Sequence, residues 1–144
     1  MGCNAGFLQM KEISGIGVDI IEIERIRKIA EKSGERFLRR VFTPNERAYC
    51  EKRYRPYENY AARFAAKEAV LKALGTGLAS GAAFADVEIL RTEKDPPKVR
   101  LHNKTAKLAE NNGIDRIMLS LSHDQSRAIA FAIAIKTETE QTDA

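Results

Sequence analysis

Glu68 and Lys72 are residues whose types and spacing suggest chemistry. Four residues apart in a predicted helix, they share one side of it and lie one turn apart. A carboxylate that can hold a metal ion, next to an ammonium that can meet a phosphate, suits a phosphoryl-group site. Small residues would leave a groove around the pair; these are Ala61, Ala65, Ala69 and Ala73. The alternative is a surface ion pair worth about 0.3 kcal/mol.

Asp19 is a carboxylate at the end of a predicted strand that is otherwise glycine and aliphatic. It precedes a predicted helix and is followed three residues later by Glu22, which is the pattern of a helix N-cap. Strand ends are also common places for ligands of hard metal ions, and Gly15 and Gly17 would let a bulky anion approach. Spacing alone favours the cap over the ligand.

The segment Ser120-Leu-Ser-His-Asp124 brings hydroxyls, an imidazole and a carboxylate together in sequence. Ser122 and His123 are adjacent on a predicted strand, so they point to opposite faces and do not form a nucleophile–base pair. No Gly-x-Ser-x-Gly motif is present either, which argues against a hydrolase triad. Taken alone, His123 at a strand end is interpreted as a hydrogen-bonded structural residue.

Basic residues gather between positions 22 and 55, where 11 Lys and Arg face six Glu, although the net charge of the chain is only +4. A basic segment attracts phosphate, nucleic acid, anionic lipid or an acidic protein. Arg25, Lys28 and Lys32 fall within about 60° of one another around a predicted helix. They form either a solvated face or a docking strip for an acidic partner.

The elements that must position these residues follow from hydrophobic periodicity and turn signals. A capping box is expected at Thr43-Pro-Asn-Glu46. In the last strand, alanines alternate with large apolar residues, which predicts burial on both faces, with the alanine face against a close helix or another subunit. Helices come early and hairpins late, which indicates an α+β fold. The expected elements are a strand at 15–20, helices at 20–32, 35–41, 44–52 and 57–74, a hairpin of 86–92 with 98–102, a helix at 104–112 capped by Asn103, and a hairpin of 116–123 with 126–136.

The composition is that of an ordinary globular protein, with 144 residues, 44% hydrophobic and 31% charged. It excludes a disordered chain, a collagen-like fibre and a disulfide scaffold. Two cysteines fit a reducing compartment, no apolar run is long enough to cross a bilayer, and the first ten residues do not resemble a secretory signal. We therefore expect a cytoplasmic protein with an extension at 1–14, one domain at 15–136, and a frayed acidic tail at 137–144.

Three signatures, in this order, resemble those of the holo-[acyl-carrier-protein] synthases, which are 4′-phosphopantetheinyl transferases. The first is Gly15-Ile-Gly-Val-Asp19-Ile-x-x-Ile-x-Arg25-Ile26, followed by Phe42-Thr43-x-x-Glu46. The second is Arg63-Phe-Ala-Ala-Lys-Glu68-Ala-x-x-Lys72-Ala-x-Gly75-Thr76-Gly77, and the third is Ser120-x-Ser122-His123. Together the matches span about Gly15 to Lys136.

The resemblance implies an enzyme that moves the 4′-phosphopantetheine arm of coenzyme A to a serine of apo-acyl carrier protein. It implies release of adenosine 3′,5′-bisphosphate, a need for Mg²⁺, a place in fatty acid biosynthesis and a homotrimer in which one long central helix packs on a small, mostly antiparallel sheet. The implied metal ligands are Asp19 and Glu68. Glu68 or a metal-bound water would accept the serine proton. The implied contacts to coenzyme A phosphates are Lys72, with Arg63 and His123 near the 3′-phosphate, and Gly75 and Thr76 would bring backbone N–H groups to an anion. Arg25, Lys28 and Lys32 would meet the acidic carrier protein.

The competing hypothesis is a small nucleic-acid- or nucleotide-binding module that uses the basic 22–55 segment. It predicts binding that falls steeply with salt. Against it, the chain has no recognisable nucleic-acid signature and only ten Phe and Tyr residues. Tyr54, Tyr57 and Tyr60 alternate with arginines like a base-stacking platform, but their spacing favours a cluster that packs on the core at a helix start.

Overall fold

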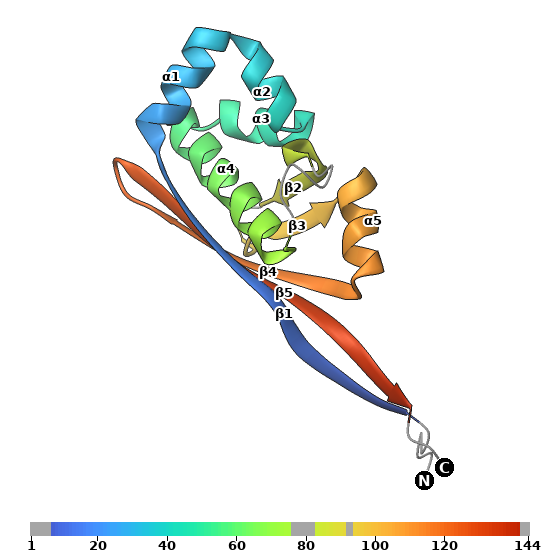
Figure 1. Ribbon diagram of the computed structural model, residues 1–144. Helices are drawn as coiled ribbons and strands as arrows, with labels where there is room; N and C mark the ends of the chain where they lie inside the picture. The colour runs from blue at the N-terminus through green and yellow to red at the C-terminus, as the bar shows by residue number, and fades with distance from the viewer. Residues whose placement is uncertain (1–6, 76–82, 92–93, 142–144) are drawn as a thin grey trace.

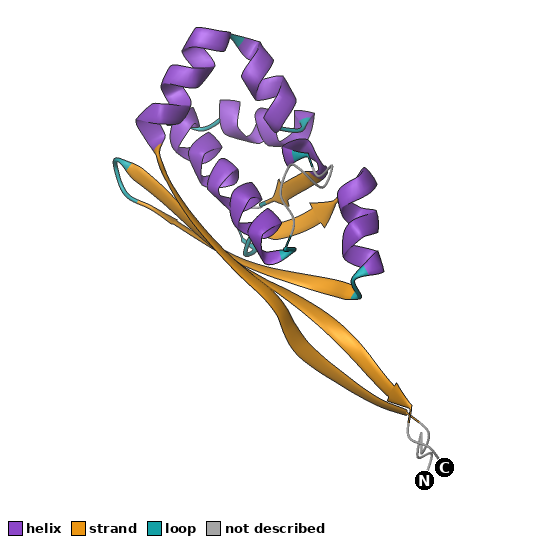
Figure 2. Ribbon diagram, viewed as in Figure 1, coloured by secondary structure: helices purple, strands orange, loops and turns teal. Residues whose placement is uncertain are grey.

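The structure, a computed structural model, describes residues 7–75, 83–91 and 94–141. Two antiparallel sheets and several helices make an α+β fold, as predicted (Figures 1 and 2). The larger sheet has the strand order β1-β5-β4, and the smaller pairs β2 with β3. The elements are β1 Phe7–Glu22, α1 Ile23–Ser33, α2 Glu35–Val41, α3 Pro44–Glu51, α4 Pro56–Ala73, the 3₁₀ turn η2 Phe84–Asp86, β2 Val87–Leu90, β3 Lys98–Leu101, α5 Asn103–Asn111, β4 Ile114–His123 and β5 Arg127–Gln141.

Helix α4 packs against the larger sheet through small side chains, and Figure 1 shows it lying along β1 and β5. Small residues allow a helix and a sheet to approach closely, which is why alanines dominate both surfaces. The fully buried alanines are Ala61, Ala65, Ala66 and Ala69 of α4, and Ala128, Ala130, Ala132 and Ala134 of β5. The alanine face of β5 is therefore covered by a helix of the same chain.

The opposite face of β5 is not covered by the described residues of this chain, so the expected burial on both sides is confirmed for the alanine face alone, and burial of the other face by another subunit stays a prediction. Ile129 and Phe131 are 40% and 43% exposed, and Ile16 of the neighbouring strand is 61% exposed. Val18, Ile20 and Met118 are also exposed, so the larger sheet presents an apolar face away from α4. The alternation of residues shows that both faces of the strand are apolar. Within a single chain, however, only one of these faces packs against another element.

Strand β1 is much longer than the six residues predicted for it. Its first half pairs with the end of β5, from Phe7 opposite Gln141 to Glu12 opposite Lys136. Residues 7–14 and 137–141, expected to be an extension and a frayed tail, therefore form a two-stranded ribbon that runs beyond the helices in Figure 1. This pairing was not predicted from the sequence, because the alternating Thr and Glu residues near the end of the chain resemble a solvated tail.

The N-terminus of α3 is capped as predicted. Thr43 Oγ1 accepts from the Glu46 amide at 3.2 Å, and the Thr43 amide donates to Glu46 Oε1 at 2.9 Å. The same carboxylate accepts from Lys67 Nζ of α4 at 2.7 Å, and both side chains are buried. This buried ion pair ties α3 to α4, the helix that carries Glu68.

Two local predictions are wrong at element ends. Helix α1 begins after Glu22, with no side-chain cap, so Asp19 lies inside β1 and is not an N-cap. Asn103 does not cap α5 either; its φ is 53° and its side-chain amide donates to Asp86 Oδ1 at 3.0 Å. Within the described residues, no helix is long and apolar enough to cross a membrane.

Candidate active site

Asp19, Glu68 and Lys72 lie together where β1 crosses α4. Lys72 Nζ donates to Asp19 Oδ1 at 3.2 Å and to the Val18 carbonyl oxygen at 3.0 Å. Burial and repulsion from the Asp19 carboxylate raise the pKa of Glu68, while the cations Lys72 and Arg25 act in the opposite direction. The structure therefore brings two of the sequence signatures into one cluster of opposite charges.

Two glycines of β1 make this meeting possible. A Cβ atom on Gly17 would lie 1.9 Å from the Ala69 carbonyl oxygen, and one on Gly15 would lie 2.0 Å from that of Ala73. Every second residue of a strand points to the same face, so Asp19 follows Gly17 toward α4. The strand lies directly on the helix backbone, which brings Asp19 to the side of α4 that carries Lys72.

The two carboxylates fit a hard divalent cation. Among residues 7–75, 83–91 and 94–141, no cluster of three or more His, Cys, Asp or Glu side chains is arranged to hold a metal. Magnesium does not require such a cage, because it often binds through one or two carboxylates together with substrate phosphates. Burial is the main cause of the raised pKa of Glu68, and the Asp19 carboxylate adds a repulsion that a bound cation would relieve.

Arg63 lies in the core and does not join this cluster. It is 2% exposed, its guanidinium stacks 4.1 Å from the centroid of the Tyr49 ring, and its Nε has no hydrogen-bond partner among the described residues. Five residues at 100° each separate Arg63 from Glu68, so the two point about 140° apart around α4. The sequence signatures did not separate Arg63 from the site, and the structure shows that its side chain is buried in the core.

His123 lies at the end of β4, beside the first turn of α4. Its Nδ1 is 3.9 Å from Glu58 Oε2 and 3.3 Å from the carbonyl oxygen of Asp124. In the strand register His123 is opposite Ala128 and Ser122 is opposite Ile129. The two side chains therefore lie on opposite faces of the sheet, as predicted.

The glycine that ends α4 is as expected, but the loop after it is beyond what the structure describes. Gly75 has a φ of 72°, and its amide donates to the Lys72 carbonyl oxygen at 3.0 Å, so this N–H already has a partner. Thr76, predicted to contact coenzyme A, lies outside the described residues.

The basic strip on α1 is exposed. Arg25, Lys28 and Lys32 all face solvent, and none forms an ion pair with another residue in the described part of the chain. Their neighbour Arg27, in contrast, pairs with Glu24 and Glu31. Arg25 is the member of the strip whose charge acts on Glu68.

The tyrosines do not form a stacking platform. Tyr60 is buried and its ring centroid lies 6.3 Å from that of Tyr57, whereas Tyr54 is 94% exposed and stands apart. The prediction of a core cluster at the helix start is confirmed for Tyr57 and Tyr60 and wrong for Tyr54. No array of exposed aromatics supports nucleic-acid binding among these three residues.

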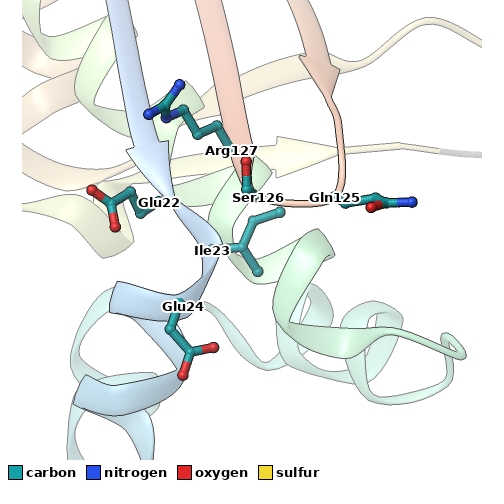
Figure 3. A pocket seen from close by; sticks show the side chains of 6 residues that line it. All are labelled: Glu22, Ile23, Glu24, Gln125, Ser126 and Arg127. Atoms are coloured by element: carbon teal, nitrogen blue, oxygen red, sulfur yellow. The ribbon is translucent and has the colours of Figure 1, made fainter.

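Arg127 is a candidate that sequence reasoning missed. It lines a hollow of about 310 Å³ between the start of α1 and the β4–β5 turn, shared with Glu22 and Ser126 (Figure 3). It also lines an adjoining hollow of about 290 Å³ with Arg25, and another of about 240 Å³ with His123. The sequence feature that could have identified Arg127 is its position directly after the turn that begins at Asp124.

Comparison with known proteins defines the class first. A sequence model of the 4′-phosphopantetheinyl transferase superfamily matches residues 15–132, which include all the signature residues above. A "Holo-[acyl-carrier-protein] synthase" from Desulforudis audaxviator is 50% identical over 129 residues, covering 90% of this chain and 98% of the relative. The chain belongs to the holo-[acyl-carrier-protein] synthase family of phosphopantetheinyl transferases.

Solved structures agree with this assignment. The holo-[acyl-carrier-protein] synthase of Neisseria meningitidis is 35% identical, has a TM-score of 0.79, and matches 85% of this chain and 98% of its own. The Helicobacter pylori synthase, solved in complex with coenzyme A, is 32% identical with a TM-score of 0.73, over 83% of this chain and 98% of that one.

Proposed function

We propose that this chain transfers the 4′-phosphopantetheine arm of coenzyme A to a serine of apo-acyl carrier protein, releases adenosine 3′,5′-bisphosphate, depends on Mg²⁺ and serves fatty acid biosynthesis in the cytoplasm. The observation that carries the proposal is the meeting of Asp19, Glu68 and Lys72. The transfer breaks a diphosphate and therefore needs positive charge beside its oxygens and an acceptor for the serine proton. Residues 15–136 would form the catalytic domain.

Asp19 and Glu68 would hold the Mg²⁺ ion. When bound, the ion would neutralise negative charge on the diphosphate. Lys72 is more than half exposed and adds a second positive charge beside the carboxylates, placed to contact coenzyme A phosphate. Burial raises the pKa of Glu68, and a raised pKa makes a carboxylate a stronger base. We therefore assign proton acceptance from the serine to Glu68.

The test is incubation of the protein with coenzyme A, Mg²⁺ and apo-acyl carrier protein, followed by the intact mass of the carrier. The carrier should gain the mass of one phosphopantetheine group, and a carrier whose acceptor serine is replaced by alanine should not. If the carrier with its serine keeps its mass, the proposed function is wrong.

We further propose that the acidic carrier docks on the basic strip of α1. Exposed charges act mainly on encounter rate and register. Lys28→Glu combined with Lys32→Glu is therefore expected to raise KM for the carrier protein about tenfold and leave KM for coenzyme A unchanged. Arg25 is kept, because its charge also acts on Glu68.

The matched control is Arg36→Glu combined with Arg40→Glu, two exposed arginines of α2. Steady-state kinetics at low and moderate salt show how KM for the carrier changes with salt. This change should be similar in the wild type and the control, and smaller in the Lys28/Lys32 variant. Equal KM values for the carrier in all three proteins would place the docking surface elsewhere.

We also propose a homotrimer, because one copy does not bring His123 to the carboxylates Asp19 and Glu68. Glu58, which faces His123, and Glu68 are ten residues apart on α4, about 15 Å of helix rise. The 3′-phosphate and the diphosphate of coenzyme A are carried on one ribose, which spans less than this. His123 of one copy and the carboxylates of another would complete the site across the apolar sheet face.

Phe131→Glu is expected to prevent this assembly without unfolding the chain, because Phe131 is on the uncovered face. Sedimentation should give the wild type about three times the 16.1 kDa chain mass, and the variant one chain mass. The rate of phosphopantetheine transfer should decrease in the variant, because the variant does not assemble. An active wild-type monomer would contradict the proposal. The control, Lys107→Glu on the exposed side of α5, should behave as the wild type.

A further inference from the structure

Glu58 is a partly buried carboxylate with no role in the site described so far. Its Oε2 lies 3.9 Å from His123 Nδ1, and its Oε1 accepts from Arg55 Nη1 at 3.2 Å. The side chain is 17% exposed, whereas that of His123 is 47% exposed. The carboxylate therefore lies behind the imidazole, on its protein side.

The turn after β4 holds the imidazole from a second direction. Asp124 Oδ1 accepts from the amides of Ser126 at 2.8 Å and Arg127 at 2.7 Å, and these bonds lower the pKa of Asp124. The turn is thereby fixed, with the Asp124 carbonyl oxygen 3.3 Å from His123 Nδ1. Both oxygens that face the ring approach Nδ1, so Nδ1 is the nitrogen that carries a proton and Nε2 is left for a ligand.

We propose that Glu58 is a positioning residue that acts through His123 in recognition of the 3′-phosphate of coenzyme A. This inference rests on the proposed function. Nε2 can donate to a phosphate oxygen only if it carries a proton, and Nδ1 already carries one. The ring that binds phosphate is then the imidazolium, and the Glu58 carboxylate compensates its charge on the protein side.

The surroundings of His123 favour an anion on the ligand side. His123 and Arg127 line the same hollow of about 240 Å³, whose other lining residues are Ile20, Ser122, Asp124, Ala128 and Ile129. The Asp124 carboxylate is turned to the amides of the hairpin, which leaves the imidazole and the guanidinium as the cationic groups of this hollow. Glu58 thus acts on a pair of groups suited to phosphate.

The test compares coenzyme A with dephospho-coenzyme A, which lacks the 3′-phosphate. Glu58→Gln keeps the size of the side chain and removes its charge. His123 is 47% exposed, so water screens the charge about 4 Å away, and its loss is expected to raise KM for coenzyme A about fivefold. KM for dephospho-coenzyme A and kcat with both substrates should stay at wild-type values. A merely structural role for Glu58 would change both substrates equally.

A double-mutant cycle decides whether Glu58 acts through His123. Glu58→Gln should have no further effect in a His123→Ala background. Glu58→Asp, which keeps the charge, should retain most of the preference for coenzyme A. The control for loss of an exposed acidic partner is Glu35→Gln, which releases Arg39 on α2.

Three outcomes would overturn the inference: equal KM changes for both substrates, an undiminished Glu58→Gln effect without His123, or Glu58→Asp behaving as Glu58→Gln. Thermal unfolding of each variant identifies those that do not fold. If Glu58→Gln is one of them, the kinetics of Glu58→Asp and of the variants in the His123→Ala background test the inference instead. The proposed function fails separately, when the wild type transfers nothing from coenzyme A.

Discussion

Asp19→Asn and Glu68→Gln, each made alone, are expected to lower kcat for phosphopantetheine transfer by about a thousandfold, or about 4 kcal/mol of barrier. Each change preserves size but removes one of the two charges proposed to hold the cation. Glu68→Gln also removes the proposed proton acceptor. Kinetics of both variants with coenzyme A and apo-carrier at saturating Mg²⁺ provide the measurement.

Metal binding gives this prediction a readout besides activity. Titration of the protein with Mn²⁺ and coenzyme A, followed by electron paramagnetic resonance, should show bound metal in the wild type and much less in either variant. Glu31→Gln, on the exposed surface of α1, is the matched control. Wild-type transfer by the folded fraction of Asp19→Asn would show that Asp19 only supports the structure and that the ligand assignment is wrong.

Local signals predicted much of this fold, because they depend on residues close in sequence. The capping box at Thr43 and the glycine stop at Gly75 are of this kind, and the structure confirms both. The α+β class followed from the order of helices and hairpins. In each case a few neighbouring side chains determine the backbone conformation.

The assignments that sequence left open depend on contacts between distant segments. Asp19 could be a helix cap or a metal ligand, and the choice depends on how far strand β1 continues. The strand continues to Glu22, because β1 pairs with β5 up to Glu22 opposite Arg127. The burial of Arg63 depends on packing against Tyr49 of another helix. The same holds for the uncovered face at Phe131, since alternation in a strand does not reveal which face finds a partner.

The close contact between β1 and α4 is what brings Asp19 to Lys72, and Gly17→Ala is expected to disrupt it. The added Cβ would lie 1.9 Å from the Ala69 carbonyl oxygen, a backbone atom that cannot rotate away. The strand must therefore move off the helix. Overpacking typically costs up to about 3 kcal/mol and occasionally more, and a 1.9 Å contact with a backbone oxygen belongs at the upper end of this range. Shifting a reacting group by about 1 Å lowers the rate about a hundredfold.

Denaturant unfolding and transfer kinetics measure the two effects separately. We expect Gly17→Ala to reduce the free energy of unfolding by about 3 kcal/mol, and its folded fraction to transfer about a hundredfold more slowly. The control is Gly113→Ala, where the new Cβ meets nothing within 4 Å, although φ is +74°. Only backbone strain of about 1 kcal/mol is expected there, with kcat unchanged. If Gly17→Ala matches this control in both measurements, the spacing between β1 and α4 is not what positions Asp19.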